Sequence, residues 1–244
     1  MKDEKTDESN SVESEPQVIV GDIMDSVAID DTNDSLGTDI HDVIEEAIEL
    51  NSWVPPQGDR WAICAPSIDL SGKWKLITTE KWKKEYDEFL KSLGQPLIVR
   101  AGAGLIVGGT REETQQSDGG RILDIKGINA KGVWKRSLVA SGSDFDTTMT
   151  PNSDGKYEHT QVPVVTADAE KVVAESWWAN DGTIHVSWTY GVKSYGGGSY
   201  ESKRYLEQNG DVYVCESTFH PSDKTREPSY LKWRFLREGA TFMP

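Results

Sequence analysis

Cysteine is scarce in this sequence of 244 residues. Cys64 and Cys215 are the only two, and they are too few for the disulfide framework of a small secreted protein. A reducing compartment is the simplest expectation, so the sequence predicts a cytoplasmic protein.

Long apolar runs are missing as well. No stretch approaches the length of about 18 apolar residues that a membrane-spanning helix requires, so we expect no transmembrane segment. The first residues, MKDEKTDESN, have no apolar core of the kind found in secretory signals.

Positive charge is not in excess. The chain holds 26 Lys and Arg against 41 Asp and Glu, a net charge of −15. Residues 1–52 contain 16 of the acidic side chains and only two lysines, so almost all of the net charge lies there. An acidic tail repels phosphate and the near-neutral remainder offers no surplus of bases, so we expect no nucleic-acid partner.

The acidic segment is also poor in aliphatic side chains, and we predict that residues 1–66 are mostly disordered. One exception is a short amphipathic helix near residues 38–50, which needs a surface to pack on. Its apolar stripe has helical spacing and consists of Ile40, Val43, Ile44, Ala47 and Ile48. The tail has three possible roles: a solvating leader, a segment that docks on the barrel or covers its mouth, or a binder of another protein. Deleting residues 1–52 and measuring ligand affinity tests the covering role.

From residue 67 to residue 240 the pattern changes to alternating apolar and polar residues between turn signals such as Asn209-Gly210. This pattern predicts an all-β domain, and a meander of such strands favours an up-and-down antiparallel barrel. The expected strands include residues 121–125, 134–139, 171–177, 184–190, 200–206, 212–218 and 230–236. A helix over Glu80–Leu93 interrupts them, because its aromatic and leucine residues have helical spacing and Gly94 follows.

Three features near the start of this domain resemble a known family. Gly72-Lys73-Trp74-Lys75-Leu76 has the form G-x-W-x-L, Tyr86–Gly94 is an aromatic, acidic, acidic, aromatic, aliphatic run ending in glycine, and Arg100 follows. Together they resemble the intracellular fatty-acid-binding proteins of the lipocalin/calycin superfamily. The resemblance implies a monomeric lipocalin-like β-barrel with a helical lid after the first strand. It also implies a cavity that binds a long-chain fatty acid or related lipid. Four additional residues, Lys81–Lys84, depart from the family pattern.

A buried carboxylate needs a cationic partner, and arginine supplies a forked one. Arg204 resembles one carboxylate-binding arginine of the family. Arg234 is the closest match to the other, although the family's Arg-x-Tyr is replaced here by Arg-x-Leu. A shift of one residue would instead turn Trp233 and Phe235 inward and leave Arg234 outside. A late arginine, Arg234 or Arg237, is also a candidate to pack over Trp74.

Alternation places Tyr213, Cys215, Ser217 and Phe219 on one face, which the resemblance implies is the interior. Of the consecutive Trp177 and Trp178, one must face inward and the other outward. The complete set of predicted ligand-binding residues is Arg204, Arg234, Arg100, Tyr213, Cys215, Phe219, Phe89 and Trp188.

The resulting hypothesis is a carrier of a small hydrophobic ligand rather than an enzyme, without a cofactor or metal, since the histidines are scattered. Ala101–Gly104 is interpreted as a hinge between the lid and the next strand. One alternative is a barrel enzyme using an acid or base such as Glu216, Asp124 or His185. Another is an interaction module with a filled barrel that works through the tail helix. The lysines of the lid helix, Lys81, Lys83, Lys84 and Lys91, suggest transient contact with an anionic membrane.

Overall fold

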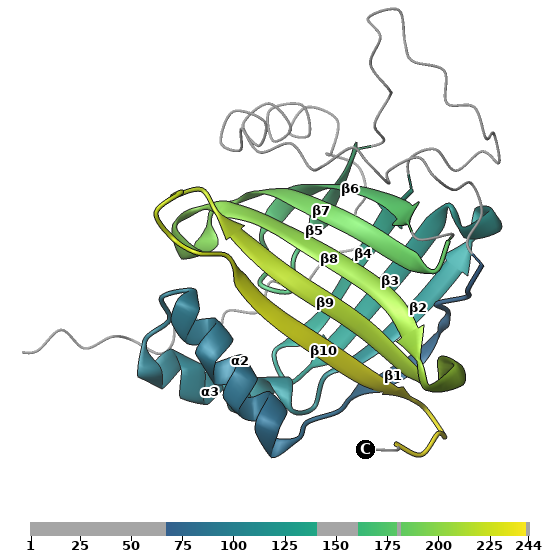
Figure 1. Cartoon of the computed structure of the whole chain (residues 1–244), viewed down its shortest axis with the longest axis horizontal. Helices are drawn as coiled ribbons and strands as arrows, with labels where there is room; N and C mark the ends of the chain where they lie inside the picture. The colour runs from purple at the N-terminus through teal and green to yellow at the C-terminus, as the bar shows by residue number, and fades with distance from the viewer. Residues whose placement is uncertain (1–66, 141–160, 180–181, 243–244) are drawn as a thin grey trace, which may run out of the picture.

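The computed structural model describes residues 67–140, 161–179 and 182–242, which form a ten-stranded antiparallel sheet with two helices (Figure 1). The predicted tail and its helix near residues 38–50 lie outside the described residues. The strands are β1 (Gly72–Leu76), β2 (Arg111–Ser117), β3 (Ile122–Asn129), β4 (Gly132–Val139), β5 (Gln161–Val165), β6 (Lys171–Ala179), β7 (Ile184–Val192), β8 (Gly198–Glu207), β9 (Val212–Pro221) and β10 (Ser229–Arg237). The helices are α2 (Glu80–Ser92) and α3 (Leu97–Val107).

The sheet curls into a nearly closed barrel. Strands that are consecutive along the chain are hydrogen-bonded neighbours, with the exception of β4 and β5, which form the two edges of the sheet. The first strand, β1, also pairs with the last strand, β10. At the seam between β4 and β5, Ala140 bridges to Ser176 of β6. This arrangement confirms the predicted up-and-down antiparallel barrel with a helical lid after the first strand. No helix in the described ranges is both long and apolar enough to cross a bilayer.

The lid helix α2 begins where the sequence predicts, because the Thr79 side chain caps it by accepting a hydrogen bond from the Trp82 backbone N–H. Its buried face carries Trp82, Phe89 and Leu90. The Trp82 indole N–H donates to the Lys232 carbonyl at 3.0 Å, and the Trp82 ring lies 5.4 Å from that of Trp233. These contacts attach α2 to β10.

The interpretation of Ala101–Gly104 as a hinge is wrong, because these residues lie inside α3. Glycine disfavours a helix by only about 1 kcal/mol per residue, which packing against a neighbour offsets. α3 runs beside α2 (Figure 1), and Arg100 Nε lies 3.3 Å from Asp87 Oδ1 of that helix.

The register of the strands fixes which side chains face the interior. Trp74 of β1 is 2% exposed and pairs with Glu112 of β2 and Arg237 of β10, so these three share the inner face. Phe235 lies on the same side of β10 and belongs to the main core cluster, which also includes Trp178. Trp177 belongs to a separate cluster on the opposite face, which confirms that the two consecutive tryptophans point in opposite directions.

Gly127 of β3 leaves room for the Trp134 ring of the neighbouring strand. A Cβ at this position would lie 1.8 Å from the indole of Trp134, its partner on β4. We expect Gly127→Ala to destabilise the protein by about 1–3 kcal/mol, because the buried indole must move. Gly102→Ala in α3 is the control. Its Cβ would meet no atom within 4 Å, so we expect stabilisation by about 0.5–1 kcal/mol. Urea unfolding measures both, and equal midpoints for the two variants would contradict the prediction.

Candidate functional site

A row of paired residues crosses the inner wall. Arg204 on β8 lies between His185 on β7 and Cys215 on β9, and Trp178 and Trp233 extend the row to β6 and β10. Arg204 is 2% exposed and His185 is 0% exposed. A cation and an imidazole are therefore held inside a mostly apolar barrel, where an unpaired charge is costly.

The adjacent row on the same wall consists of small hydroxyl side chains. Pairing aligns Ser176, Ser187, Ser202 and Ser217 across β6 to β9. Ser187 accepts a hydrogen bond from Nη1 of Arg204 at 2.7 Å. Serine side chains are much smaller than the Trp178, Arg204 and Trp233 side chains of the first row.

Hydrogen-bonding groups around Arg204 remain unused. Within the described part of the chain, Nε of Arg204, the Tyr213 hydroxyl and both ring nitrogens of His185 are buried and have no hydrogen-bond partner. Burial, with Glu112 adding to it, raises the pKa of Tyr213 well above its ordinary value, so the hydroxyl stays protonated as a donor. Buried polar groups normally have partners, so this concentration of unused groups indicates a binding site.

A second cation faces the same interior from β4. Arg136 shares the inner face with Trp134 and Leu138, and its Nε is enclosed without a hydrogen-bond partner among the described residues. Burial lowers the pKa of Arg136, and Arg204 adds to the effect. Burial raises the pKa of Glu112, against the opposing influence of Arg136 and Arg204. The site therefore combines two guanidinium groups with one carboxyl group whose charge is disfavoured.

His185 makes stability depend on pH. Burial, followed by Arg204 and Arg136, lowers its pKa well below 6.5. The unfolded chain therefore takes up a proton below about pH 6.5 that the folded chain does not, and stability falls with decreasing pH. We expect the stability advantage of wild type over His185→Gln to shrink by about 1 kcal/mol from pH 7 to pH 5.5.

Urea unfolding of both proteins at the two pH values tests this prediction. Taking the difference between them removes the opposite contribution of Glu112, whose raised pKa favours the folded state as pH falls. A difference in unfolding free energy between the two proteins that is the same at pH 7 and pH 5.5 would contradict the prediction.

The structure brings several of the predicted residues to the interior. Tyr213 and Phe219 are 0% exposed, and Cys215 lies between them on the same face. The Tyr213 ring stacks on Trp74 at 5.3 Å. Phe89 belongs to the underside of the lid, in the same core cluster.

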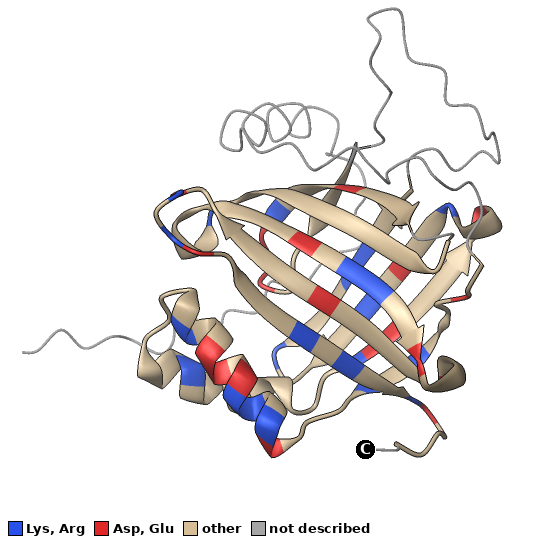
Figure 2. Cartoon of the chain, in the orientation of Figure 1, with Lys and Arg blue, Asp and Glu red and all other residues tan. Residues whose placement is uncertain are grey.

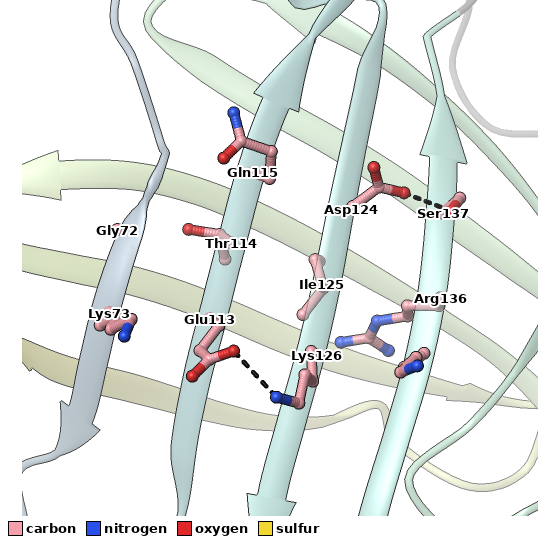
Figure 3. Close-up of a pocket in the computed structure, with 11 residues that line it drawn as sticks. Gly72, Lys73, Glu113, Thr114, Gln115, Asp124, Ile125, Lys126, Arg136 and Ser137 are labelled. Atoms are coloured by element: carbon pink, nitrogen blue, oxygen red, sulfur yellow. Dashed lines mark hydrogen bonds and ion pairs between the residues drawn. The ribbon is translucent and has the colours of Figure 1, made fainter.

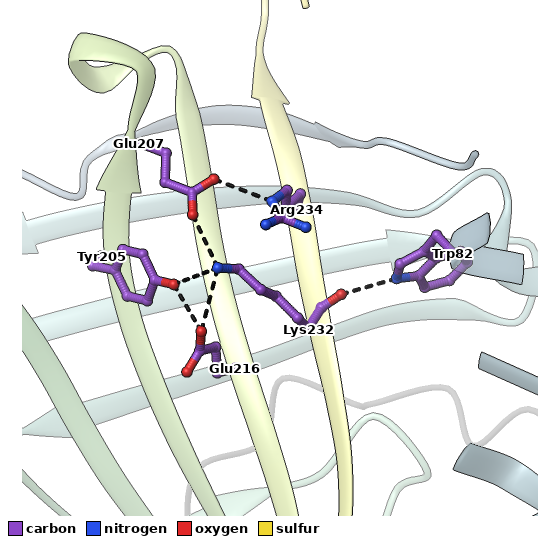
Figure 4. Close-up of polar contacts among 6 residues, drawn as sticks. All are labelled: Trp82, Tyr205, Glu207, Glu216, Lys232 and Arg234. Atoms are coloured by element: carbon purple, nitrogen blue, oxygen red, sulfur yellow. Dashed lines mark hydrogen bonds and ion pairs between the residues drawn. The ribbon is translucent and has the colours of Figure 1, made fainter. Parts of the chain in front are cut away.

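Arg234 does not reach the interior. Pairing with Val214 places it on the outer face, where its Nε lies 3.1 Å from Glu207 Oε2 (Figure 4). Lys232 joins that outer network through Glu207 and Glu216. The structure therefore has the register in which Trp233 and Phe235 face inward, because these aromatic side chains contact the core and the lid.

Trp188 and Arg100 also lie away from the interior. Trp188 pairs with Glu175 and Glu201 on the outer face, and its ring stacks on His220 at 4.7 Å. Arg100 contacts Asp87 between the lid helices. The strands β6 and β7 are buried on both faces, which is why alternation did not separate inward from outward tryptophans.

Arg237, rather than Arg234, packs over Trp74. Its guanidinium carbon lies 4.2 Å from the ring centroid, and the group donates to the carbonyls of Ser71 and Gly210 at 3.2 and 3.0 Å. This contact joins the last strand to the first.

A groove of about 490 Å³ lies on the outer face of β1–β4. Figure 3 shows its polar contacts: Lys126 Nζ lies 3.0 Å from Glu113 Oε2, and Ser137 donates to Asp124. All of its lining residues come from these four adjacent strands and none from the opposite wall. Arg136 belongs to this lining as well, so the groove borders the arginine site on β4.

Sequence reasoning missed Arg136 and Glu112. Arg136 alternates with the apolar Trp134 and Leu138 along β4, and this signal could have placed its side chain in the barrel interior. Glu112 belongs to β2, whose sequence REETQQS has no apolar alternation to reveal an inner face.

Comparison with known proteins gives a likeness of fold. No protein-family model and no curated protein sequence matches the chain. Among solved structures, the chain is similar to apo Caenorhabditis elegans lipid binding protein 8, with 14% identity over 72% of this chain and 99% of that chain and a TM-score of 0.47. It is also similar to the REP1-NXSQ fatty acid transporter, with 14% identity over 71% and 98% of the two chains and a TM-score of 0.46. For Echinococcus granulosus fatty-acid-binding protein 1 the identity is 12% over 69% and 96%, with a TM-score of 0.43.

Proposed function

We propose that the protein binds one long-chain fatty acid, or a related anionic lipid, inside the barrel and carries or sequesters it. The observation that carries this proposal is the buried Arg204, surrounded by unused hydrogen-bonding groups of Tyr213 and His185. A carboxylate accepts hydrogen bonds from guanidinium and hydroxyl donors, and its charge offsets that of the two interior arginines.

The acyl chain supplies most of the expected affinity. Each buried methylene contributes about 0.8 kcal/mol, so ten of them give roughly 8 kcal/mol, the scale of a micromolar affinity before association costs. The chain would lie along the serine row and among aromatic side chains such as Phe219 and Trp178. The arginine site would then hold the headgroup at one end of the ligand.

A carrier accounts for the interior better than an enzyme does. Of the acids and bases weighed for catalysis, Asp124 and Glu216 lie on the outer face, where Asp124 accepts from Ser137 and Glu216 contacts Lys232. His185 faces the interior with a lowered pKa, which leaves it neutral and a poor proton donor. We place the protein in the cytoplasm, acting as a monomer without a cofactor.

The lid suggests how a ligand reaches a membrane. Leu97, Ala101 and Leu105 lie on one exposed face of α3, and Leu97 and Leu105 are 70% and 86% exposed. The lysines of α2 alternate with acidic side chains (Figure 2), and Lys83 and Lys81 pair with Glu80 and Glu85. We therefore propose that apolar contact by α3 contributes more to membrane contact than the basic face of α2.

Transfer of a fluorescent fatty acid to vesicles tests the membrane contact. Rates that rise with vesicle concentration would support it, and Leu105→Ser should then slow the transfer. Rates independent of the concentration of both neutral and anionic vesicles would overturn it.

The binding proposal is tested by calorimetric titration with oleate and, as a matched probe, oleyl alcohol, which has the same chain without the charge. We expect oleate to bind at one site per chain and oleyl alcohol to bind at least about 10-fold more weakly, since charge-assisted hydrogen bonds contribute about 1.5–3 kcal/mol. Absence of binding by either probe would mean a filled barrel in which the arginines are structural.

A further inference from the structure

Glu112 brings a carboxyl group into the barrel beside the arginine site. Pairing places it on β2 between Trp74 of β1 and Gly127 of β3, and it is 8% exposed. Because Gly127 has no side chain, the ring of Trp134 from β4 occupies the space next to it. An ionised carboxylate near two buried indoles is shielded from water, so its charge depends on nearby cations.

Those cations are the two arginines that the proposed ligand also needs. Arg136 lies in the neighbouring inner row, which pairs Thr114 of β2 with Ile125 of β3 and Arg136 of β4. Arg204 faces the same interior from β8. Burial raises the pKa of Glu112, whereas Arg136 and Arg204 act in the opposite direction by favouring the carboxylate. Glu112 is therefore positioned to offset the guanidinium charges with its own negative charge.

An anionic headgroup competes with Glu112 for these arginines. Two anions that share one buried site repel each other, and one of them takes up a proton. Burial already disfavours the charge of Glu112, whereas a headgroup can accept hydrogen bonds from Arg204 Nε and the Tyr213 hydroxyl, which have no partner among the described residues. Glu112 is therefore the group to be neutralised. Its O–H then becomes a further donor to the headgroup.

The surroundings of Glu112 contain one other group that can take up a proton in response to an anion. On the neighbouring strands β1 and β3, the charged side chains Lys73 and Lys126 lie on the outer face beside Glu113. The charged and titratable groups that face the interior from the other described strands are Arg136, His185, Arg204, Tyr213, Cys215 and Arg237.

Most of these groups keep their protons whether or not a ligand is bound. The guanidinium groups remain charged, and the raised pKa of Tyr213 keeps its hydroxyl protonated. Arg237 already donates to the backbone carbonyls of Ser71 and Gly210. His185 is neutral, so an anion beside it also favours its protonation, and the test must separate it from Glu112.

We propose that Glu112 takes up one proton when an anionic headgroup binds beside Arg136 and Arg204, so that the protein holds its ligand more tightly at low pH than at high pH. Glu112 is ionised in the free protein and neutral in the complex. The complex therefore carries the additional proton, and a fall in pH favours it. This inference rests on the proposed function, because it concerns the same interior site.

Isothermal titration calorimetry with oleyl sulfate tests the inference. A sulfate ester keeps its single negative charge over the range from pH 5.5 to pH 8, so any proton taken up belongs to the protein. Titrations in HEPES and in Tris, whose ionisation enthalpies differ, give the number of protons taken up at each pH. We expect uptake to reach about one proton, and the dissociation constant to rise about tenfold for each pH unit where uptake is complete. Oleyl alcohol, which has no charge, should cause no uptake.

Glu112→Gln identifies the group that takes up the proton. The glutamine side chain has nearly the same shape and cannot ionise, so we expect uptake to vanish and oleyl sulfate affinity to become independent of pH. Glu113→Gln is the matched control, since Glu113 is the next residue on β2, lies on the outer face and contacts Lys126 Nζ at 3.0 Å. This control and His185→Gln should both keep the uptake of wild type.

Two results would overturn the inference and leave the proposed function standing. One is binding of oleyl sulfate by the wild type without proton uptake anywhere between pH 5.5 and pH 8, a result that needs no variant. The other is uptake that persists in Glu112→Gln and is lost in His185→Gln, which would assign the proton to the imidazole. Failure of the wild type to bind both oleyl sulfate and oleate would instead overturn the proposed function, and this inference with it.

Discussion

Replacing Arg204 by glutamine is expected to weaken oleate binding by about 10- to 150-fold. Arg204 is buried beside Tyr213 and His185, and its Nε has no hydrogen-bond partner within the described residues. A hydrogen bond to a charged group contributes about 1.5–3 kcal/mol, and each 1.4 kcal/mol corresponds to a factor of about ten in affinity. Isothermal titration calorimetry measures the change directly.

Arg234→Gln is the matched control for this experiment. Arg234 lies on the outer face and contacts Glu207, so its loss should leave oleate affinity within about twofold of wild type, as for most surface substitutions. Oleyl alcohol provides a second control, because a ligand without charge should bind both variants alike. Equal losses of oleate affinity in the two variants would contradict the placement of the carboxylate at Arg204.

Replacing Trp74 by alanine should cost about 3–5 kcal/mol of the free energy of unfolding, a large part of the 5–15 kcal/mol typical of a domain. Trp74 is 2% exposed and its indole N–H donates to Thr114 Oγ1 at 2.8 Å. Its ring also contacts Tyr213 and the guanidinium of Arg237. The substitution therefore leaves a cavity where the first and last strands meet.

Urea unfolding measures whether this loss of stability exceeds the loss caused by removing an exposed aromatic ring. Tyr230→Ala is the control, since Tyr230 is 53% exposed on the outer face of β10 and should cost less than about 1 kcal/mol. Trp74→Phe should fall between the two because it keeps a ring but loses the hydrogen bond to Thr114. A Trp74→Ala midpoint equal to that of Tyr230→Ala would show that the contact with Arg237 and Tyr213 contributes little.

The lid and most strands were predictable because their signals are local. The aromatic residues of α2 have helical spacing between a capping Thr79 and a terminating Gly94, and turns such as Asn209-Gly210 separate strands that alternate. Alternation within β9 placed Tyr213 on one face with Cys215 and Phe219, and the family resemblance, not alternation, implied that this face and Arg204 lie inside. β5, β2 and the full extent of α3 were not predicted, since β2 is polar throughout and α3 contains two glycines.

The sequence by itself determined that this chain forms an antiparallel meander with a helix after its first strand, because helical and strand periodicities are properties of neighbouring residues. Only the tertiary structure decided which face of several strands is the inside. Alternation of apolar and polar residues identifies the inner face of a strand when one face is exposed to water and the other is buried. β10 has long side chains on both faces, and β6 and β7 are buried on both, so Arg234 and Trp188 were misplaced. The meeting of Arg136, Glu112 and Arg204 likewise required barrel closure, since it joins strands β2, β4 and β8, which are far apart in the chain.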